Sequence, residues 1–352
     1  MRPIKRIVFT LILYCLASAQ SEAVQKNYVF TTYSQEDGLS SGTIKKIVQD
    51  SAGYFWFLSE NGLSRFDGYS FKIYSHDPNN SLSIPSSNLL NMWVDEEKHI
   101  YLATEKALLL FHPSSNSFET IFSTRNQKDI LNYLPYKGGF LFVKDNQLGF
   151  FNKKNQKIFT YNLPSNLSLG RKKGIRIQND NIWFSCEDGI LCYFEAEKKI
   201  SKIPIQQSNT VDAPLDFSSL HLFVNNKSEM CFYSNATLYK FNASKKIFQP
   251  YLNLKLKESS FNPIKSIQQY DTCSILLRFQ YNRIGILNFN TGNLKYIYLN
   301  PYPKVSNDSI RIFSIYPSTP TTMWVSTTNS GIYAVETKNL SVLEHLFGDE
   351  KN

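Results

Sequence analysis

Cysteine and histidine are scarce in this sequence, and neither occurs in a spacing typical of metal ligation. The 352 residues include five cysteines and five histidines, and none of them forms the short, paired spacings of zinc sites. The signatures G-x-S-x-G and H-E-x-x-H, which mark common hydrolases and metalloproteases, are absent from the sequence. We therefore expect no metal, no cofactor and no catalytic residues in this chain.

Dense clusters of basic residues are also lacking, although the formal net charge is +9. Lysine and arginine are scattered singly or in adjacent pairs among polar and aromatic residues, and only Arg171-Lys172-Lys173 forms a run of three. Nucleic-acid binding domains usually concentrate basic residues on one face or element. We interpret the scattered charges as a solvated surface and expect no nucleic-acid partner.

Long apolar runs are missing except for one short segment at the start. The basic stretch Met1–Arg6 precedes the ten apolar positions of Ile7–Leu16, and an Ala-x-Ala site ends at Ala19. This pattern is typical of a secretory signal peptide, and ten residues are too few to span a bilayer. We expect residues 1–19 to be a cleaved signal peptide and residues 20–352 to be exported to the periplasm.

What the sequence does contain is a sevenfold repeat. Each copy has a three-residue apolar strand centre, then turn residues, then a small residue followed by Leu or Ile, and in most copies an aromatic residue three positions later. Consecutive strand centres are 40 to 48 residues apart, which is the length of one propeller blade. Apolar segments before and after each such hairpin supply two further strands. The seven centres are Trp56, Tyr101, Leu141, Trp183, Cys231, Leu276 and Trp324.

The repeat predicts an all-β protein, a single β-propeller of seven four-stranded blades with almost no helix. Four bulky residues at one repeated position are interpreted as core that packs against the next blade, rather than as a surface for stacking sugar rings. They are Trp56, Tyr101, Trp183 and Trp324.

Two details stay open at this stage. The last blade could be completed by residues 28–33 as its outer strand, or by residues 340–346. Cys186 and Cys192 flank a predicted turn, so they either form a disulfide across the hairpin or are two small buried side chains, and we favour the second reading.

The loops joining the second and third strands of each blade are the predicted ligand site. In a propeller these loops gather on one face around the axis, while the strands hold them rigidly. Their amides, hydroxyls and charges would suit a polar ligand, although exposed turns are polar in any case. The candidate binding residues are Glu60, Asn61, Lys106, Asp145, Asp188, Tyr281 and Arg283.

The first blade carries a recognisable pattern. Its segments are Tyr33–Ser40 (YSQEDGLS), Ile47–Phe57 (IVQDSAGYFWF) and Asn61–Gly68 (NGLSRFDG). This pattern resembles the regulator-propeller repeat of the hybrid two-component system sensors of glycan-foraging gut bacteria. In that family a periplasmic region of two seven-bladed propellers and a small β-sandwich precedes a membrane helix, a histidine kinase, a receiver and a DNA-binding domain.

The resemblance implies an extracytoplasmic sensor that recognises a carbohydrate or oligosaccharide and relays the signal to a kinase outside this chain. It also implies a homodimer in the parent protein, anchored in the inner membrane by a downstream helix. Residues 346–352 begin a linker like the one after the first blade, so we expect the chain to stop before a second propeller. Two alternatives remain: a secreted propeller enzyme, such as a lyase or a quinoprotein-like dehydrogenase, and a protein-interaction platform.

Overall fold

The structure is a computed structural model, in which most of the chain after residue 27 is described. The described residues are 28–80, 83–95, 97–123, 134–144, 147–152, 157–162, 174–186, 189–206, 215, 220–225, 227–234, 237–254, 264–288, 291–299 and 310–337. The predicted signal peptide and the predicted linker at residues 346–352 lie outside them. In the described part every regular element is a strand, and none of it is a helix long and apolar enough to cross a membrane.

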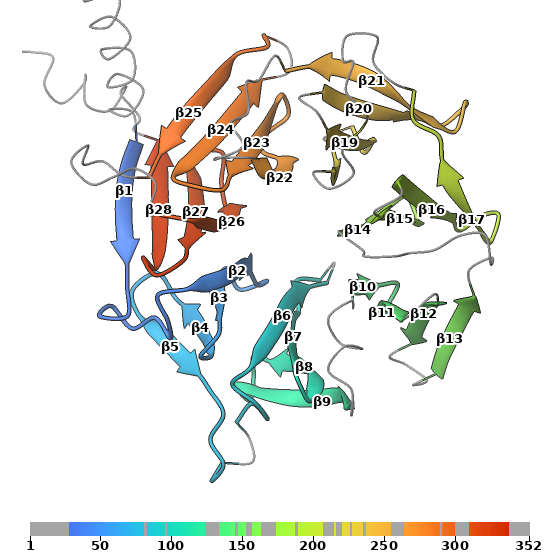
Figure 1. Cartoon of the computed structure of the whole chain (residues 1–352). Coiled ribbons are helices and arrows are strands. Elements are labelled where there is room, and N and C mark those ends of the chain that lie inside the picture. Colours follow the sequence, from blue (N-terminus) through green and yellow to red (C-terminus); the bar gives the residue numbers. More distant parts are fainter. Residues whose placement is uncertain are drawn as a thin grey trace, which may run out of the picture.

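Seven antiparallel sheets of four strands surround a common axis (Figure 1), as the repeat predicted. The first three blades are β2 (Ile44–Gln49), β3 (Phe55–Ser59), β4 (Leu63–Phe66), β5 (Phe71–Tyr74); β6 (Leu89–Val94), β7 (Ile100–Thr104), β8 (Ala107–His112), β9 (Ser117–Ser123); and β10 (Leu134–Tyr136), β11 (Gly139–Lys144), β12 (Gln147–Asn152), β13 (Lys157–Asn162). The next three are β14 (Gly174–Gln178), β15 (Asn181–Cys186), β16 (Gly189–Phe194), β17 (Lys199–Ile203); β18 (His221–Val224), β19 (Met230–Ser234), β20 (Thr237–Asn242), β21 (Ile247–Asn253); and β22 (Ile264–Gln269), β23 (Ser274–Phe279), β24 (Arg283–Asn288), β25 (Leu294–Tyr298). The seventh blade contains β26 (Ile312–Pro317), β27 (Thr322–Thr327), β28 (Ile332–Thr337) and β1 (Tyr28–Tyr33).

The ring closes through the first strand of the chain. β1 pairs antiparallel with β28, in a register that runs from Tyr28 opposite Thr337 to Tyr33 opposite Ile332, and Figure 1 shows the two strands side by side. Residues 28–33 are therefore the outer strand of the seventh blade. The competing segment 340–346 lies outside the described residues.

The four bulky residues at the repeated strand centre are core, as predicted. Trp56 and Trp183 are fully buried, Tyr101 is 4% exposed and Trp324 is 6% exposed. Each packs with residues from the neighbouring blade; Trp56 lies with Leu102 and Phe111 of the second blade, for example. Burial of such large rings is a dominant source of stability in sheet-on-sheet packing.

A β-bulge recurs in the innermost strand of four blades. The register shifts after the first strand residue, between Ile44 and Lys46 in β2 and between Leu89 and Asn91 in β6, and likewise in β22 and β26. A bulge bends the strand and re-aims the side chain that follows it. The side chains after these bulges are therefore placed in the same way in each of the four blades.

The two cysteines of the fourth blade do not form a disulfide. The register places Cys192 opposite Trp183 and Cys186 opposite Gly189. Cys186 packs between the third and fourth blades, whereas Cys192 packs between the fourth and fifth. The side chains thus point to opposite faces of one sheet, and both are buried.

Thiol reactivity should separate Cys273 from the other three cysteines of the described region. Burial raises the pKa of the Cys192 thiol and raises that of Cys231 to about 12, so neither supplies the reactive thiolate at neutral pH. Cys273 is partly exposed. We expect a thiol reagent at pH 7.5 to label Cys273 in the folded protein and to label Cys186, Cys192 and Cys231 only in denaturant. If labelling of all four cysteines in denaturant required a reductant, the absence of a disulfide would be contradicted.

Candidate functional site

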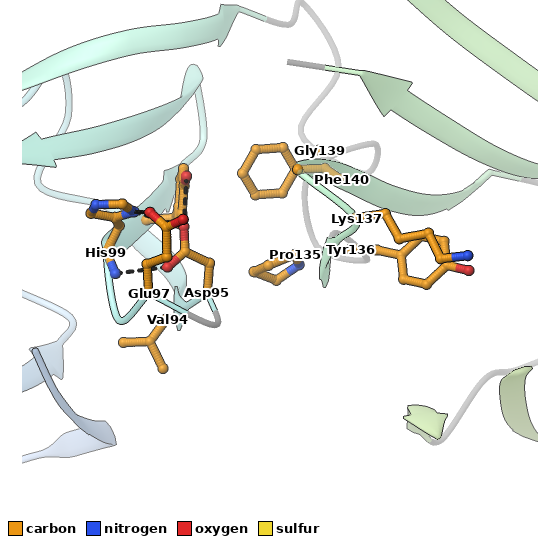
Figure 2. A pocket seen from close by; sticks show the side chains of 11 residues that line it. Val94, Asp95, Glu97, His99, Pro135, Tyr136, Lys137, Gly139 and Phe140 are labelled. Atoms are coloured by element: carbon orange, nitrogen blue, oxygen red, sulfur yellow. Dashed lines mark hydrogen bonds and ion pairs between the residues drawn. The ribbon is translucent and has the colours of Figure 1, made fainter. Parts of the chain in front are cut away.

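A pocket of about 440 Å³ lies between the second and third blades. Its walls are the turn that joins β6 to β7 and the turn that joins β10 to β11 (Figure 2). The first turn supplies polar side chains, and the second supplies apolar and aromatic ones. The lining residues are Val94, Asp95, Glu97, His99, Tyr101, Pro135, Tyr136, Lys137, Gly138, Gly139 and Phe140.

Asp95 organises the polar wall of the pocket. Its Oδ1 accepts a hydrogen bond from the His99 backbone N–H at 2.8 Å. Its Oδ2 accepts from His99 Nδ1 at 2.9 Å and from the Tyr101 hydroxyl at 3.1 Å. Glu97 Oε2 lies 3.5 Å from the same His99 nitrogen. Four polar side chains are thereby held in one arrangement.

The hydroxyl of Tyr101 is protonated at neutral pH. Burial is the main cause that raises its pKa far above the usual value, and the negative charge of Asp95 adds to the effect. The phenol therefore donates a hydrogen bond permanently, and here it donates to Asp95. The carboxylates of Asp95 and Glu97 present acceptor oxygens to the pocket.

The opposite wall is apolar, and Pro135 supplies its accessible surface in front of the buried ring of Phe140. Phe140 is 1% exposed, and its ring meets that of Tyr101 edge to face, with centroids 4.8 Å apart and an interplanar angle of 79°. Pro135 lies beside Phe140 (Figure 2). A pocket with carboxylate acceptors on one side and an apolar wall on the other suits a small ligand rich in hydroxyl groups.

A second cavity, of about 300 Å³, adjoins the first on the far side of Tyr136 and Lys137. Figure 2 shows these two side chains pointing away from Asp95 and Glu97. Lys137 forms ion pairs with Asp180 at 3.1 Å and with Glu195 at 3.7 Å, and the Tyr136 hydroxyl donates to the Asp180 carbonyl oxygen at 3.2 Å. Four aromatic rings line this cavity: Tyr136, Phe150, Tyr161 and Tyr193.

The bond between Asp95 and Tyr101 is a repeated device of the blades. In the first blade Asp50 accepts from Trp56 Nε1 at 2.7 Å, and in both blades the acid stands six residues before the strand-centre aromatic. This spacing is visible in the sequence and could have directed attention to the β6–β7 turn. The pocket itself has no linear signature, because its second wall comes from another blade.

The described residues among those predicted to bind ligand lie at the opposite end of the strands from this pocket, since successive turns of an antiparallel sheet alternate between its two ends. Glu60 forms an ion pair with Lys45 at 3.2 Å, and the Asn61 backbone N–H donates to Ser59 Oγ at 3.1 Å. Lys106 Nζ lies 3.5 Å from the Pro85 carbonyl oxygen.

The remaining described candidates, Tyr281 and Arg283, lie at the β23–β24 turn of the sixth blade. The guanidinium of Arg283 stacks over the ring of Phe279 at 3.9 Å and lies 4.9 Å from that of Tyr296, and Arg311 lies over the ring of Tyr281. Asp145 and Asp188 lie outside the described residues. A ligand role for the whole predicted set stays a prediction.

Comparison with known proteins gives one relative by sequence. No family model matches the chain. A stretch of 77 residues, 22% of the chain, is 39% identical to "Histidine kinase P4" of Formosa agariphila. The stretch is 6% of the length of that kinase.

Solved structures match almost the whole propeller. The extracellular domain of a hybrid two-component system from B. thetaiotaomicron matches 88% of the chain with a TM-score of 0.64 and 20% identity, and a second such domain from the same bacterium matches 87% with a TM-score of 0.62 and 17% identity. The chain spans 42% and 39% of these two structures. A protein named YCF48, solved with a D1 peptide bound, matches 89% of the chain with a TM-score of 0.60 and 8% identity. At these identities the likeness establishes the propeller fold.

Proposed function

We propose that this chain is the extracytoplasmic sensing propeller of a two-component signalling regulator, and that it binds an oligosaccharide rather than transforming one. The observation that carries the proposal is the pair of matches to sensors: the whole propeller is similar to extracellular domains of hybrid two-component systems, and one segment is similar to a histidine kinase. The chain covers less than half of those extracellular domains, so the kinase, the membrane helix and a homodimer belong to the proposal for the parent protein.

The pocket between the second and third blades is the proposed sugar site. Carboxylates such as those of Asp95 and Glu97 accept hydrogen bonds from sugar hydroxyls, and the adjoining apolar wall can pack against the less polar face of a sugar ring. The second cavity continues past Tyr136 and Lys137, so a chain of several sugars would fit better than a single one. Ligand binding would then change a dimer geometry in the parent rather than drive chemistry in this segment.

Two exposed glutamates test the location of the site. Glu97 lies in the pocket, and Glu60 lies on the opposite face among the loops predicted from the sequence; their side chains are 79% and 63% exposed. We expect Glu97→Gln to weaken oligosaccharide binding about tenfold, the effect of one charge-assisted hydrogen bond, and Glu60→Gln to leave it unchanged. The measurement is isothermal titration calorimetry with a panel of neutral and acidic oligosaccharides.

If Glu60→Gln weakened binding and Glu97→Gln did not, the site would lie among the loops predicted from the sequence. Turnover of any oligosaccharide in the panel would contradict the sensing role and favour a propeller enzyme. The structure of YCF48 with a bound peptide gives the second alternative, a protein-interaction platform, a basis, and binding of peptides without any sugar binding would favour it.

A further inference from the structure

The innermost strands of several blades carry basic residues, and these strands surround the axis of the ring. Innermost strands of neighbouring blades contact one another, as β2 does with β6 and β26, and β18 with β14 and β22, and Figure 1 shows them surrounding the centre. The basic residues are Lys46 on β2, Arg176 on β14, His221 on β18, Lys265 on β22 and, on the adjoining strand β23, Arg278.

The hydrogen-bond partners of these side chains are neutral oxygens. Lys46 Nζ donates to Asn91 Oδ1 at 3.0 Å, and Arg176 Nη1 donates to the Ile175 carbonyl oxygen at 2.9 Å. His221 Nε2 lies 3.3 Å from the Ile264 carbonyl oxygen.

Arg278 is held in the same way. Its Nε donates to Ser266 Oγ at 2.9 Å and its Nη1 to the Ile312 carbonyl oxygen at 2.8 Å. Within the part of the chain that the structure describes, no ion pair joins a carboxylate to any of the five basic residues, although Lys45, next to Lys46, is paired with Glu60.

The positive charges of these basic groups lower one another's pKa values. Burial lowers the pKa of Lys46 to about 8, and the positive charge of Arg176 adds to the decrease. Lys46 belongs to the first blade and Arg176 to the fourth, so this repulsion joins two blades that are not neighbours in the ring. Burial also lowers the pKa of His221 to about 4, against a hydrogen bond to Ile264 that raises it, and Arg278, Arg176 and Lys265 lower it further. Burial lowers the pKa of Arg278 to about 10.

We propose that the basic residues of the innermost strands form a binding site at the centre of the ring for an oxyanion group, a sulfate, phosphate or carboxylate, held by Lys46, Arg176 and Arg278. Three cations near one another with no carboxylate partner among the described residues repel one another and attract a multivalent anion. Guanidinium groups suit the paired oxygens of such anions, and a lysine adds a mobile point charge. Asn91 and Ser266, already bonded to Lys46 and Arg278, hold these two side chains in place. The site is separate from the pocket between the second and third blades.

Binding of inorganic sulfate and of a sulfated monosaccharide tests the proposal. At constant ionic strength set with sodium chloride, we expect sodium sulfate to raise the melting temperature saturably at millimolar concentration. Glucose 6-sulfate binding more tightly than inorganic sulfate would identify an anion carried on a sugar, and the reverse would identify a free anion. Absence of saturable stabilisation by both would overturn the proposal.

Three variants separate binding at the proposed anion site from general salt effects. Arg176→Gln and Lys46→Gln should each weaken sulfate binding at least tenfold, without lowering the melting temperature of the unliganded protein, because each relieves repulsion. Lys202→Gln, a change of an exposed lysine on β17, should bind like the wild type. Equal sulfate stabilisation in all three variants would overturn the proposal.

Proton uptake gives a readout that a purely structural role would not produce. An anion beside Lys46 raises its pKa from about 8 toward the value of free lysine, so binding at pH 8 to 9 should take up part of a proton. Calorimetric titrations in buffers of different ionisation enthalpy measure this uptake. The Lys46→Gln variant should lose it, and uptake that is unchanged in that variant would remove Lys46 from the site. The result is independent of whether the pocket between the second and third blades binds sugar.

Discussion

Replacing Gly331 by alanine is expected to lower the free energy of unfolding by about 2–5 kcal/mol. Alanine is strained in the left-handed backbone conformation of this position, and its Cβ atom would also collide with a neighbouring strand. Gly331 has a φ of +69°, and a Cβ atom there would lie 2.1 Å from the carbonyl oxygen of Tyr33. That oxygen belongs to the strand that closes the ring. The collision is with backbone, so no side-chain rotation relieves it, and β1 would have to separate from β28.

Gly292 offers a matched control. It has the same φ of +69°, but a Cβ atom there would meet nothing within 4 Å. Gly292→Ala should therefore cost only the strain of the left-handed conformation, about 1–2 kcal/mol. Urea denaturation of both variants measures the difference, which isolates the contact between Gly331 and Tyr33. Equal losses for the two variants would contradict closure of the ring by β1.

Several contacts explain why the junction between the seventh and first blades is sensitive to substitution at Gly331. The Gly331 N–H donates to the Gly42 carbonyl oxygen at 2.8 Å, which ties the last blade to the segment after β1. Trp324 of the seventh blade contacts the rings of Phe55 and Phe57 of the first blade, with centroids 4.8 and 5.5 Å apart. The ring of Tyr33 stacks on the same tryptophan at 5.8 Å. Displacing β1 would loosen this aromatic cluster as well as the strand ladder.

The fold was predictable from the sequence because the same hairpin pattern recurs in each blade. A strand centre such as Trp56 or Trp183 is followed at a fixed distance by the next strand of its hairpin, so the pattern is local and recurs. Ring closure was not predictable, because β1 and β28 lie about 300 residues apart and both 28–33 and 340–346 were possible outer strands. No local pattern distinguishes two strands that compete for the same distant edge.

The candidate site was less predictable, for a geometric reason. The loops around Glu60 and Lys106 were singled out because such loops gather on one face, whereas the pocket lies between turns of the other face and takes its walls from Asp95 and Phe140 of different blades. The basic residues of the innermost strands were not singled out either. Lys46 and Arg176 lie 130 residues apart in the sequence and were interpreted as solvated surface, but the ring brings innermost strands from distant segments around one axis.

Asp50 is expected to be worth far more to stability than its place in a turn suggests. Asp50 is buried, with 7% of its surface exposed. It accepts hydrogen bonds from Trp56 Nε1 at 2.7 Å and from the backbone N–H groups of Ala52 and Tyr54 at 3.0 Å each. Asp50→Ala leaves three donors without this acceptor, and the indole N–H is buried. We expect a loss of about 3–4 kcal/mol in the free energy of unfolding, measured by urea denaturation.

Asp67 is the control for this prediction, because it accepts the same number of hydrogen bonds in an exposed turn. Its carboxylate accepts from the backbone N–H groups of Tyr69 and Ser70 and from the Ser70 hydroxyl, and those groups can turn to water when the acid is removed. Asp67→Ala should therefore cost much less than Asp50→Ala. In the fourth blade the buried Trp183 Nε1 has no hydrogen-bond partner among the described residues, so the indole ring can be buried without an acid. If Asp50→Ala lowered the free energy of unfolding no more than Asp67→Ala, the prediction would be wrong. The burial of the Trp56 ring, and not its hydrogen bond to Asp50, would then stabilise the first blade.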